Sequence, residues 1–141
     1  MRSKDTIRVS FEIFDFGNDP ADLTKSLGIE PSSISRKGEE KLVGPSERPA
    51  RVKVVQNMWS LDSELDASEG VERHVDALLA KLMPHRQEIK KITEAASARF
   101  RCTLLLEDPR PGISFSPEQS KQMADLNAVL DLDIYFTGKN D

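Results

Sequence analysis

Three polar side chains near the end of the chain have the types and spacing that chemistry requires. Asp131, Asp133 and Tyr135 alternate with apolar residues, so they share one face of an expected strand, with the two aspartate Cα atoms about 7 Å apart. Paired carboxylates at this separation can cleave glycosides or hold a divalent cation. The alternative is a solvated sheet face on which the acids form cross-strand ion pairs. The arginines expected on neighbouring strands are Arg8, Arg99 and Arg101. Because no further oxygen ligand is evident, we expect ion pairs and no metal.

Two single residues could serve a site from other elements. His74 lies between Val71 and Leu78 of an apolar stripe, where an imidazole could act as a general base or a pH switch. No second histidine or cysteine occurs at metal-ligand spacing, so a buried, hydrogen-bonded histidine is the preferred interpretation. Trp59 is the one tryptophan. It could line a pocket or anchor a partner, but we expect it to pack in the core.

A basic pair and a single cysteine complete the candidates. Arg36 and Lys37 precede a glycine, and two cations on such a turn could bind an anion. The spacing of a phosphate loop is absent, so an ordinary charged turn is preferred. Cys102 falls on an apolar strand face, where burial raises the pKa of a thiol and leaves it unreactive. We therefore assign no catalytic residue and no cofactor.

The composition limits the class of protein. The chain has 141 residues, 38% of them hydrophobic and 31% charged, with a net charge of -4, and this length can bury one core without disulfides or metal. No apolar run approaches the roughly 18 residues of a membrane span, and no secretory signal pattern is present. An acidic chain is a poor partner for nucleic acid, whose phosphates need clustered Lys and Arg. We expect one cytoplasmic domain over residues 1–141 that binds neither membrane nor nucleic acid.

Alternating apolar and polar residues predict the strands. The alternation occurs over residues 6–16, 52–61, 99–107 and 129–136. The second run changes face midway, which indicates a bulge or a late start of the strand. A proline-rich turn at 108–112 would lead into a short additional strand at 113–115.

Helical spacing and capping residues predict the helices. They cover residues 20–27, 71–82, 85–97 and 116–127. The first follows Asp19 and ends at Gly28, and the last begins with the capping-box spacing of Ser116 and Gln119. Residues 30–51 are rich in proline, glycine and charge, so we expect a long loop that contains at most a small hairpin. Loops of this length are functional or disordered more often than inert.

Strands with one polar face, interspersed with amphipathic helices, predict an α+β fold. We expect a mainly antiparallel sheet of about four to five strands with helices packed on one face and the other face open. A ferredoxin-like variant is the architecture that fits best, with the helix over residues 71–82 covering the sheet.

A series of short motifs spans most of the chain. In order, they are residues 19–20 and 27–31, Lys37-Gly38, Trp59-Ser60-Leu61, His74-Val75, Leu78-Leu79, Ser116-Pro117-Glu118 and Asp133-Ile134-Tyr135. Their order and spacing resemble the uncharacterised bacterial family named domain of unknown function 4279. Asn127 departs from the pattern, because that family more often has glycine before its last strand. The resemblance implies a small stand-alone bacterial cytoplasmic domain without an established activity.

The absence of a recognisable catalytic, metal or nucleotide motif in the sequence favours an interaction domain over an enzyme. We expect a non-enzymatic protein-binding module, immunity-like by analogy, which uses the open sheet face or residues 30–51 against a protein partner. The alternative is a small hydrolase or ligand-binding enzyme centred on the acidic pair and Tyr135, with His74, and it requires these residues to meet in one pocket. A homodimer formed through the sheet face or edge is a third option.

Overall fold

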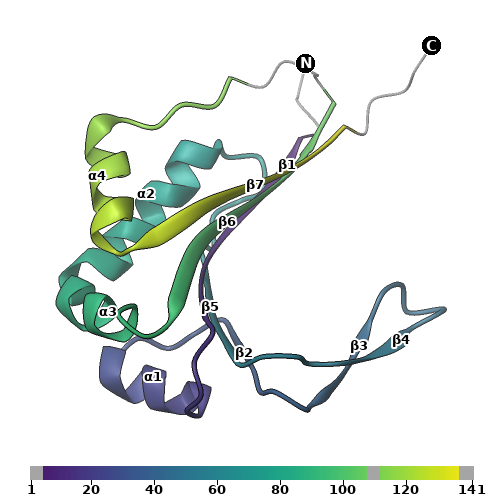
Figure 1. The fold of residues 1–141 in the computed structure, drawn as a ribbon. Coiled ribbons are helices and arrows are strands. Elements are labelled where there is room, and N and C mark those ends of the chain that lie inside the picture. Colours follow the sequence, from purple (N-terminus) through teal and green to yellow (C-terminus); the bar gives the residue numbers. More distant parts are fainter. Residues whose placement is uncertain (1–4, 108–111, 137–141) are drawn as a thin grey trace.

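A five-stranded sheet is the centre of the computed structural model, which describes residues 5–107 and 112–136. The strand order is β2-β5-β1-β6-β7. The bounds are β1 Thr6–Phe14, β2 Ser33–Ser35, β5 Met58–Asp62, β6 Ser97–Leu106 and β7 Ala128–Phe136. Neighbours run antiparallel except β6 and β7, which are parallel (Figure 1). The prediction of an α+β fold with a mostly antiparallel sheet is confirmed.

Four helices accompany the sheet: α1 Pro20–Leu27, α2 Val71–Leu82, α3 Arg86–Ile92 and α4 Pro117–Asp125. A parallel strand pair needs a crossover connection, usually helical, and α4 lies in the crossover from β6 to β7. Helix α2 packs against β1 and α4 against β7. This succession of elements differs from the β-α-β-β-α-β order of a ferredoxin-like domain, so that part of the prediction is not confirmed.

The predicted helix boundaries follow from local chemistry. Asp19 Oδ1 accepts a hydrogen bond from Ala21 N at 2.8 Å, and Gly28 ends α1 with φ 71°, a left-handed conformation that glycine adopts without a Cβ penalty. Ser116 and Gln119 form the predicted capping box of α4. The break after α2 is also present, as a single 3-10 turn over Met83–His85. Helix α3 then ends at Ile92, earlier than the apolar spacing indicated.

The core lies between β1, β5, β6 and the helices. Phe11 and Phe100 are fully buried, with ring centroids 5.2 Å apart. The predicted apolar stripe of α2 is buried, including Val75 and Leu78 at 0% exposure. Burying such a side chain fully is worth about 1.5–3 kcal/mol, so the α2 contact with β1 is a main contribution to stability.

Two strand predictions need correction. Of the two alternatives for residues 52–61, the late start is confirmed and the bulge is not: β5 begins at Met58, and the earlier residues belong to a separate strand, β4, Ala50–Lys53. The change of face in the sequence marks the point where the chain leaves one sheet and enters another. Residues 113–115 form no strand, and the preceding predicted turn lies largely outside the described residues, which omit 108–111.

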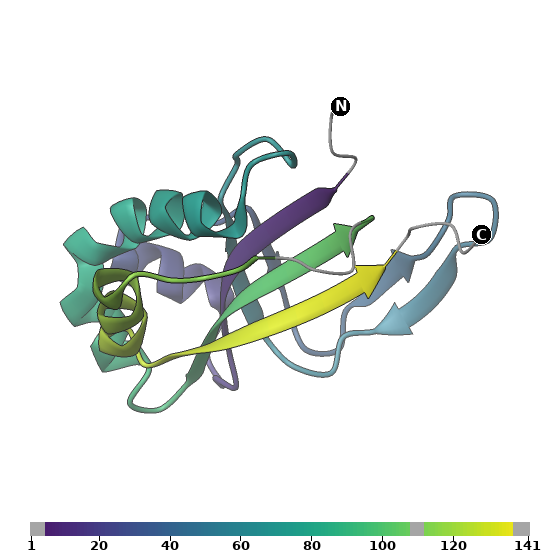
Figure 2. The ribbon, with the colours of Figure 1, turned by 90° about the horizontal axis from the view of Figure 1, so that it is seen from above.

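Residues 38–54 form a two-stranded extension, here named the hairpin arm. In it β3, Glu40–Val43, pairs antiparallel with β4, and the backbone pairs of Gly38 N with Val54 O and of Val54 N with Glu39 O continue the hairpin. Figures 1 and 2 show it projecting from the body of the protein. The predicted long loop therefore contains the expected small hairpin, and also the short strand β2, which joins the main sheet.

Candidate functional site

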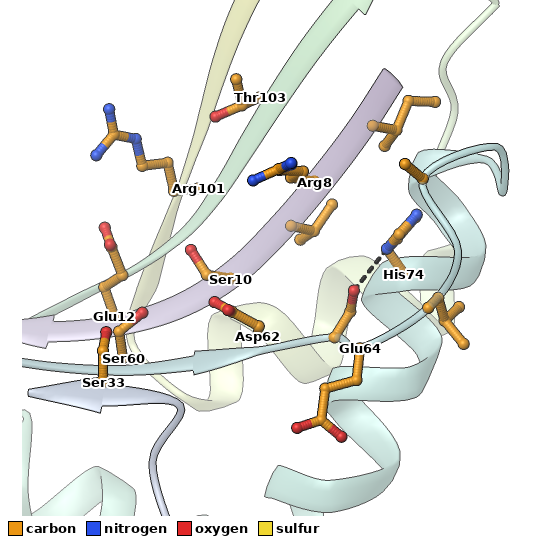
Figure 3. Close-up of a pocket in the computed structure, with 15 residues that line it drawn as sticks. Arg8, Ser10, Glu12, Ser33, Ser60, Asp62, Glu64, His74, Arg101 and Thr103 are labelled. Atoms are coloured by element: carbon orange, nitrogen blue, oxygen red, sulfur yellow. Dashed lines mark hydrogen bonds between the residues drawn. The ribbon is translucent and has the colours of Figure 1, made fainter. Parts of the chain in front are cut away.

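A concave region on the polar side of the sheet has a volume of about 580 Å³ (Figure 3), within the range of about 300–1,000 Å³ typical of ligand sites. We name it the sheet depression. Its polar lining includes Arg8, Ser10, Glu12, Ser60, Asp62, Arg101 and Thr103. Apolar residues of β1 and the segment 63–67 close one end.

Strand register brings these side chains together. Successive residues of a strand point to opposite faces of the sheet, so the polar positions of β1 share a face. Ser10 lies opposite Asp62 of β5 on one side and Arg101 of β6 on the other. Arg8 lies opposite Thr103, one pleat further along. The depression is therefore built on three adjacent strands and its geometry is fixed by their backbone hydrogen bonds.

Several polar groups in the sheet depression have no partner among the described residues. Within the part of the chain that the structure describes, the side chains of Arg8, Asp62, Ser10, Ser60 and Thr103 make no hydrogen bond or ion pair. Arg8 and Asp62 carry opposite charges and are not paired with each other. The depression thus offers a cation, an anion and three hydroxyl groups to a molecule outside the chain.

An ion-pair network forms the rim beside β7. Arg99 Nε donates to Glu12 Oε1 at 2.7 Å, and Arg99 Nη1 lies 3.7 Å from Asp131 Oδ2. Arg101 Nε lies 3.3 Å from Asp133 Oδ2. Both predicted acids are therefore held by arginines of β6, in the cross-strand arrangement that the sequence indicated. Neither acid lines the depression.

His74 lies at the closed end of the depression and is 1% exposed (Figure 3). Its Nδ1 is 2.5 Å from Ser63 Oγ, while Nε2 makes no hydrogen bond with the described residues. Burial lowers the pKa of His74 below its usual value. The backbone carbonyls and the negative charges of Glu69 and Asp66 act in the opposite direction but do not cancel this effect. The neutral imidazole links α2 to the segment that follows β5.

The remaining predicted residues lie elsewhere. Trp59 is 0% exposed and its Nε1 donates to Thr24 Oγ1 at 3.0 Å, a core position. Tyr135 is 57% exposed on β7. The guanidinium of Arg36 contacts both carboxylate oxygens of Asp19 at 3.1–3.3 Å, and this contact holds the pKa of Asp19 below its usual value.

The base of the hairpin arm is thereby attached to α1. The backbone N of Lys37 donates to Asn57 Oδ1 at 2.8 Å, and Asn57 Nδ2 donates to Phe16 O and Asn18 O, each at 3.1 Å. Arg36 and Lys37 therefore contribute to the position of the arm. The side chain of Lys37 is exposed.

The described residues contain no group of three or more His, Cys, Asp or Glu side chains that could hold a metal ion. In the same ranges, no helix has the length and apolar character needed to cross a bilayer. Burial, with Asp131 and Asp133 nearby, raises the pKa of the Cys102 thiol to about 12. A thiol with that pKa is not a nucleophile at neutral pH.

Sequence reasoning missed the sheet depression as a site. Ser10, Asp62 and Thr103 are ordinary polar residues in alternating strands, and their convergence depends on which strands are neighbours. The order β5-β1-β6 is not readable from spacing along the chain.

A family model described as "Domain of unknown function (DUF4279)" matches residues 5–137. The chain belongs to this family. Neither a curated protein nor a solved structure matches it significantly. The predicted family membership is thus confirmed over nearly the whole chain.

The asparagine that departs from the DUF4279 pattern has a structural explanation. Asn127, between α4 and β7, takes φ 54°, and asparagine is among the few residues other than glycine that tolerate this left-handed conformation. Its Nδ2 also donates to Thr93 Oγ1 at 3.1 Å. The DUF4279 domain therefore keeps the backbone geometry that a glycine would permit at this position.

Proposed function

We propose that this DUF4279 domain is a non-catalytic protein-binding module that receives a segment of a partner protein on the polar face of the sheet, beside the hairpin arm. The observation that carries the proposal is the set of groups in the sheet depression that have no partner in residues 5–107 and 112–136, above all Arg8 and Asp62. Charged groups of both signs on a rigid scaffold confer partner specificity. Hydroxyl groups between them can bond to the backbone of an extended segment.

The hairpin arm supports the same proposal through apolar surface. Leu42, Val43 and Val52 are 66%, 45% and 46% exposed. An isolated two-stranded hairpin is marginally stable in water, and exposed apolar groups clustered on one projection are typical of interaction sites. A partner that covers them would gain roughly 25 cal/mol for each Å² of apolar surface buried.

The alternative, a carboxylate-centred enzyme, has less support from the geometry. It requires His74, Asp131 and Asp133 to converge on one substrate. His74 contacts Ser63 at the closed end of the depression, whereas the aspartates contact arginines on its opposite rim. The charge of each carboxylate is balanced by an arginine, so neither is placed as a strong general base.

An immunity-like role is the narrower form of this proposal. Such a protein binds one partner tightly and blocks it, and it needs a shaped, rigid surface more than a catalytic group. A bacterial cytoplasmic setting follows from the family resemblance and is part of the proposal.

Affinity capture from the native host, followed by quantitative mass spectrometry, tests the proposal. The tagged wild-type domain is compared with Arg8→Glu in the depression and Leu42→Asp on the arm. Arg86→Glu is the matched control, because Arg86 is exposed on α3 and the charge change is the same.

We expect one protein to be enriched by the wild type and by the control, and its recovery to fall about tenfold or more with either surface variant. This corresponds to about 1.4 kcal/mol or more, comparable to the roughly 1.5–3 kcal/mol of a hydrogen bond to a charged group. Equal recovery from all four domains would contradict the proposal, as would enrichment of a small metabolite with no protein.

A further inference from the structure

We propose that two copies of this chain associate through the free edge of β7, so that their sheets join antiparallel about a two-fold axis at Leu132. The interface uses a different surface from the sheet depression and the hairpin arm. The inference therefore stands independently of the proposed protein-binding function.

Within the described residues, β7 presents a long edge that no other strand covers. The strand has nine residues and is paired on one side only, with β6. Figure 2 shows it as the outermost strand of the sheet. Natural edge strands avoid pairing by being short or by carrying proline, charged side chains or bulges. The sequence AVLDLDIYF has no proline or lysine, and its two charged residues, Asp131 and Asp133, are each paired with an arginine of β6. The opposite edge, β2, has only three residues.

Apolar side chains of β7 are exposed on both faces. On the face that alternates with the two aspartates, Leu130, Leu132 and Ile134 are 37%, 42% and 39% exposed, and Phe136 is 57% exposed. This row is only partly covered, because no further strand lies beyond β7 within the described residues. On the other face, Val129 and Tyr135 are 59% and 57% exposed. An apolar edge of this kind favours association.

The strand is complementary to itself in one register. With the axis at Leu132, all nine residues of each copy find a partner. Leu132 then faces its own copy, Leu130 faces Ile134, and Val129 faces Tyr135. The first two pairs are apolar, and the third joins an aromatic with a β-branched side chain. Such cross-strand pairs stabilise neighbouring strands.

The charges permit this register. Asp131 of one copy faces Asp133 of the other, a repulsive pair if it stood alone. Within each copy, however, Arg99 lies 3.7 Å from Asp131 and Arg101 lies 3.3 Å from Asp133. Each aspartate therefore has an arginine behind it that reduces the repulsion across the interface, and Arg99 is shared between Asp131 and Glu12.

The length of β7 sets the width that the interface needs. A nine-residue strand is about 30 Å long, and a specific interface buries at least roughly 1,000 Å² in total, or about 500 Å² from each copy. A strip about 17 Å wide meets this value.

The first test is molecular mass in solution, measured by size-exclusion chromatography with light scattering at high micromolar concentration. We expect twice the chain mass of 15.8 kDa for the wild type. Leu132→Lys, which brings two lysines together at the axis, should weaken association at least tenfold. Val55→Lys is the control, because it makes the same charge change at an exposed position outside β7.

The second test is a disulfide, and it does not depend on a disruptive variant. Leu132 lies beside Cys102 in the β6–β7 register, so Cys102→Ala is introduced first. Directly opposed residues of antiparallel strands have Cα atoms about 4.5–5.5 Å apart, within the range of about 4.4–6.8 Å for a disulfide. Leu132→Cys should therefore crosslink rapidly between copies. Leu105→Cys, with a similar exposure of 37% but far from the axis, should not.

Each outcome decides the inference. A monomeric wild type, a Leu132→Lys variant that remains dimeric, or equal crosslinking at positions 132 and 105 would overturn it. If Leu132→Lys fails to fold, selective crosslinking at position 132 supports the inference and its absence refutes it. If the edge of β7 instead binds a strand of another protein, the purified chain will be monomeric, which is the first refuting result.

Discussion

The contact between Arg99 and Glu12 provides a quantitative test of how the rim of the sheet depression is held. The Glu12 side chain is 8% exposed, that of Arg99 is 23% exposed, and the Nε–Oε1 distance is 2.7 Å. Arg99 also lies over the Phe14 ring at 4.6 Å. Replacing Arg99 with methionine keeps much of the aliphatic stem but leaves a nearly buried carboxylate without its cation.

The expected loss follows from that burial. Removing one partner of a fully buried pair costs about 3–5 kcal/mol. Since Arg99 is partly exposed, we expect Arg99→Met to lower the free energy of unfolding by about 2–3 kcal/mol, or roughly 8–12 °C in Tm at about 4 °C per kcal/mol. Glu12→Gln removes only the charge of the acceptor, and it should cost about 1 kcal/mol.

The double variant separates pairing from packing. Without Arg99, the loss of the Glu12 charge relieves an unpaired anion, so Arg99→Met/Glu12→Gln should cost only about 1.5 kcal/mol, giving a coupling energy of about 2 kcal/mol. Urea unfolding followed by the fluorescence of the buried Trp59 measures all three variants. Arg101→Met is the control, because the side chains of Arg101 and Asp133 are 47% and 39% exposed and such pairs are worth at most about 1 kcal/mol. Additivity of the two single changes within about 0.5 kcal/mol would refute the reasoning.

Three further predictions concern single residues. Burial lowers the pKa of His74 below 6.5, so the unfolded chain takes up the proton first as pH falls. The free energy of unfolding should therefore decline as the pH falls below about 6.5, and it should decline less in His74→Gln. Equal pH slopes for the wild type and His74→Gln would contradict this reasoning. The Cys102 thiol, with its pKa at about 12, should react with a disulfide reagent only after unfolding, and fast reaction of the native protein would show that it is accessible. Asn127→Ala leaves a residue with a Cβ at φ 54° but removes the side-chain amide that makes this conformation tolerable. It should lower the free energy of unfolding in urea by about 1 kcal/mol, whereas an unchanged midpoint would show that the turn relaxes.

The elements with strong local signals could be predicted from the sequence. The amphipathic spacing of α2, the Asp19 cap with Gly28, and the capping box at Ser116 each act within a few residues, and the structure has all three. Cys102 was correctly assigned to the buried face because strand alternation is also local.

Features that depend on contacts distant in the sequence could not be predicted in the same way. The parallel pairing of β7 with β6, and the edge position that leaves the Leu132 row half exposed, depend on strand order. The sheet depression depends on β1 lying between β5 and β6. The ion pairs of Asp131 and Asp133 are intermediate, because the acids and the arginines were visible in the sequence whereas their register was not.

Site-specific photo-crosslinking in the native host tests the central claim most directly, because it reports which surface contacts a partner. A benzophenone amino acid is placed at Thr103 in the sheet depression, at Leu42 on the hairpin arm, and at the exposed control position Gln87 of α3. The proposed function predicts that the first two positions crosslink to the same protein and that the control does not. Crosslinking of that protein from Gln87 alone, or of no protein from Thr103 and Leu42, would contradict the claim that the polar sheet face and the arm form the binding surface.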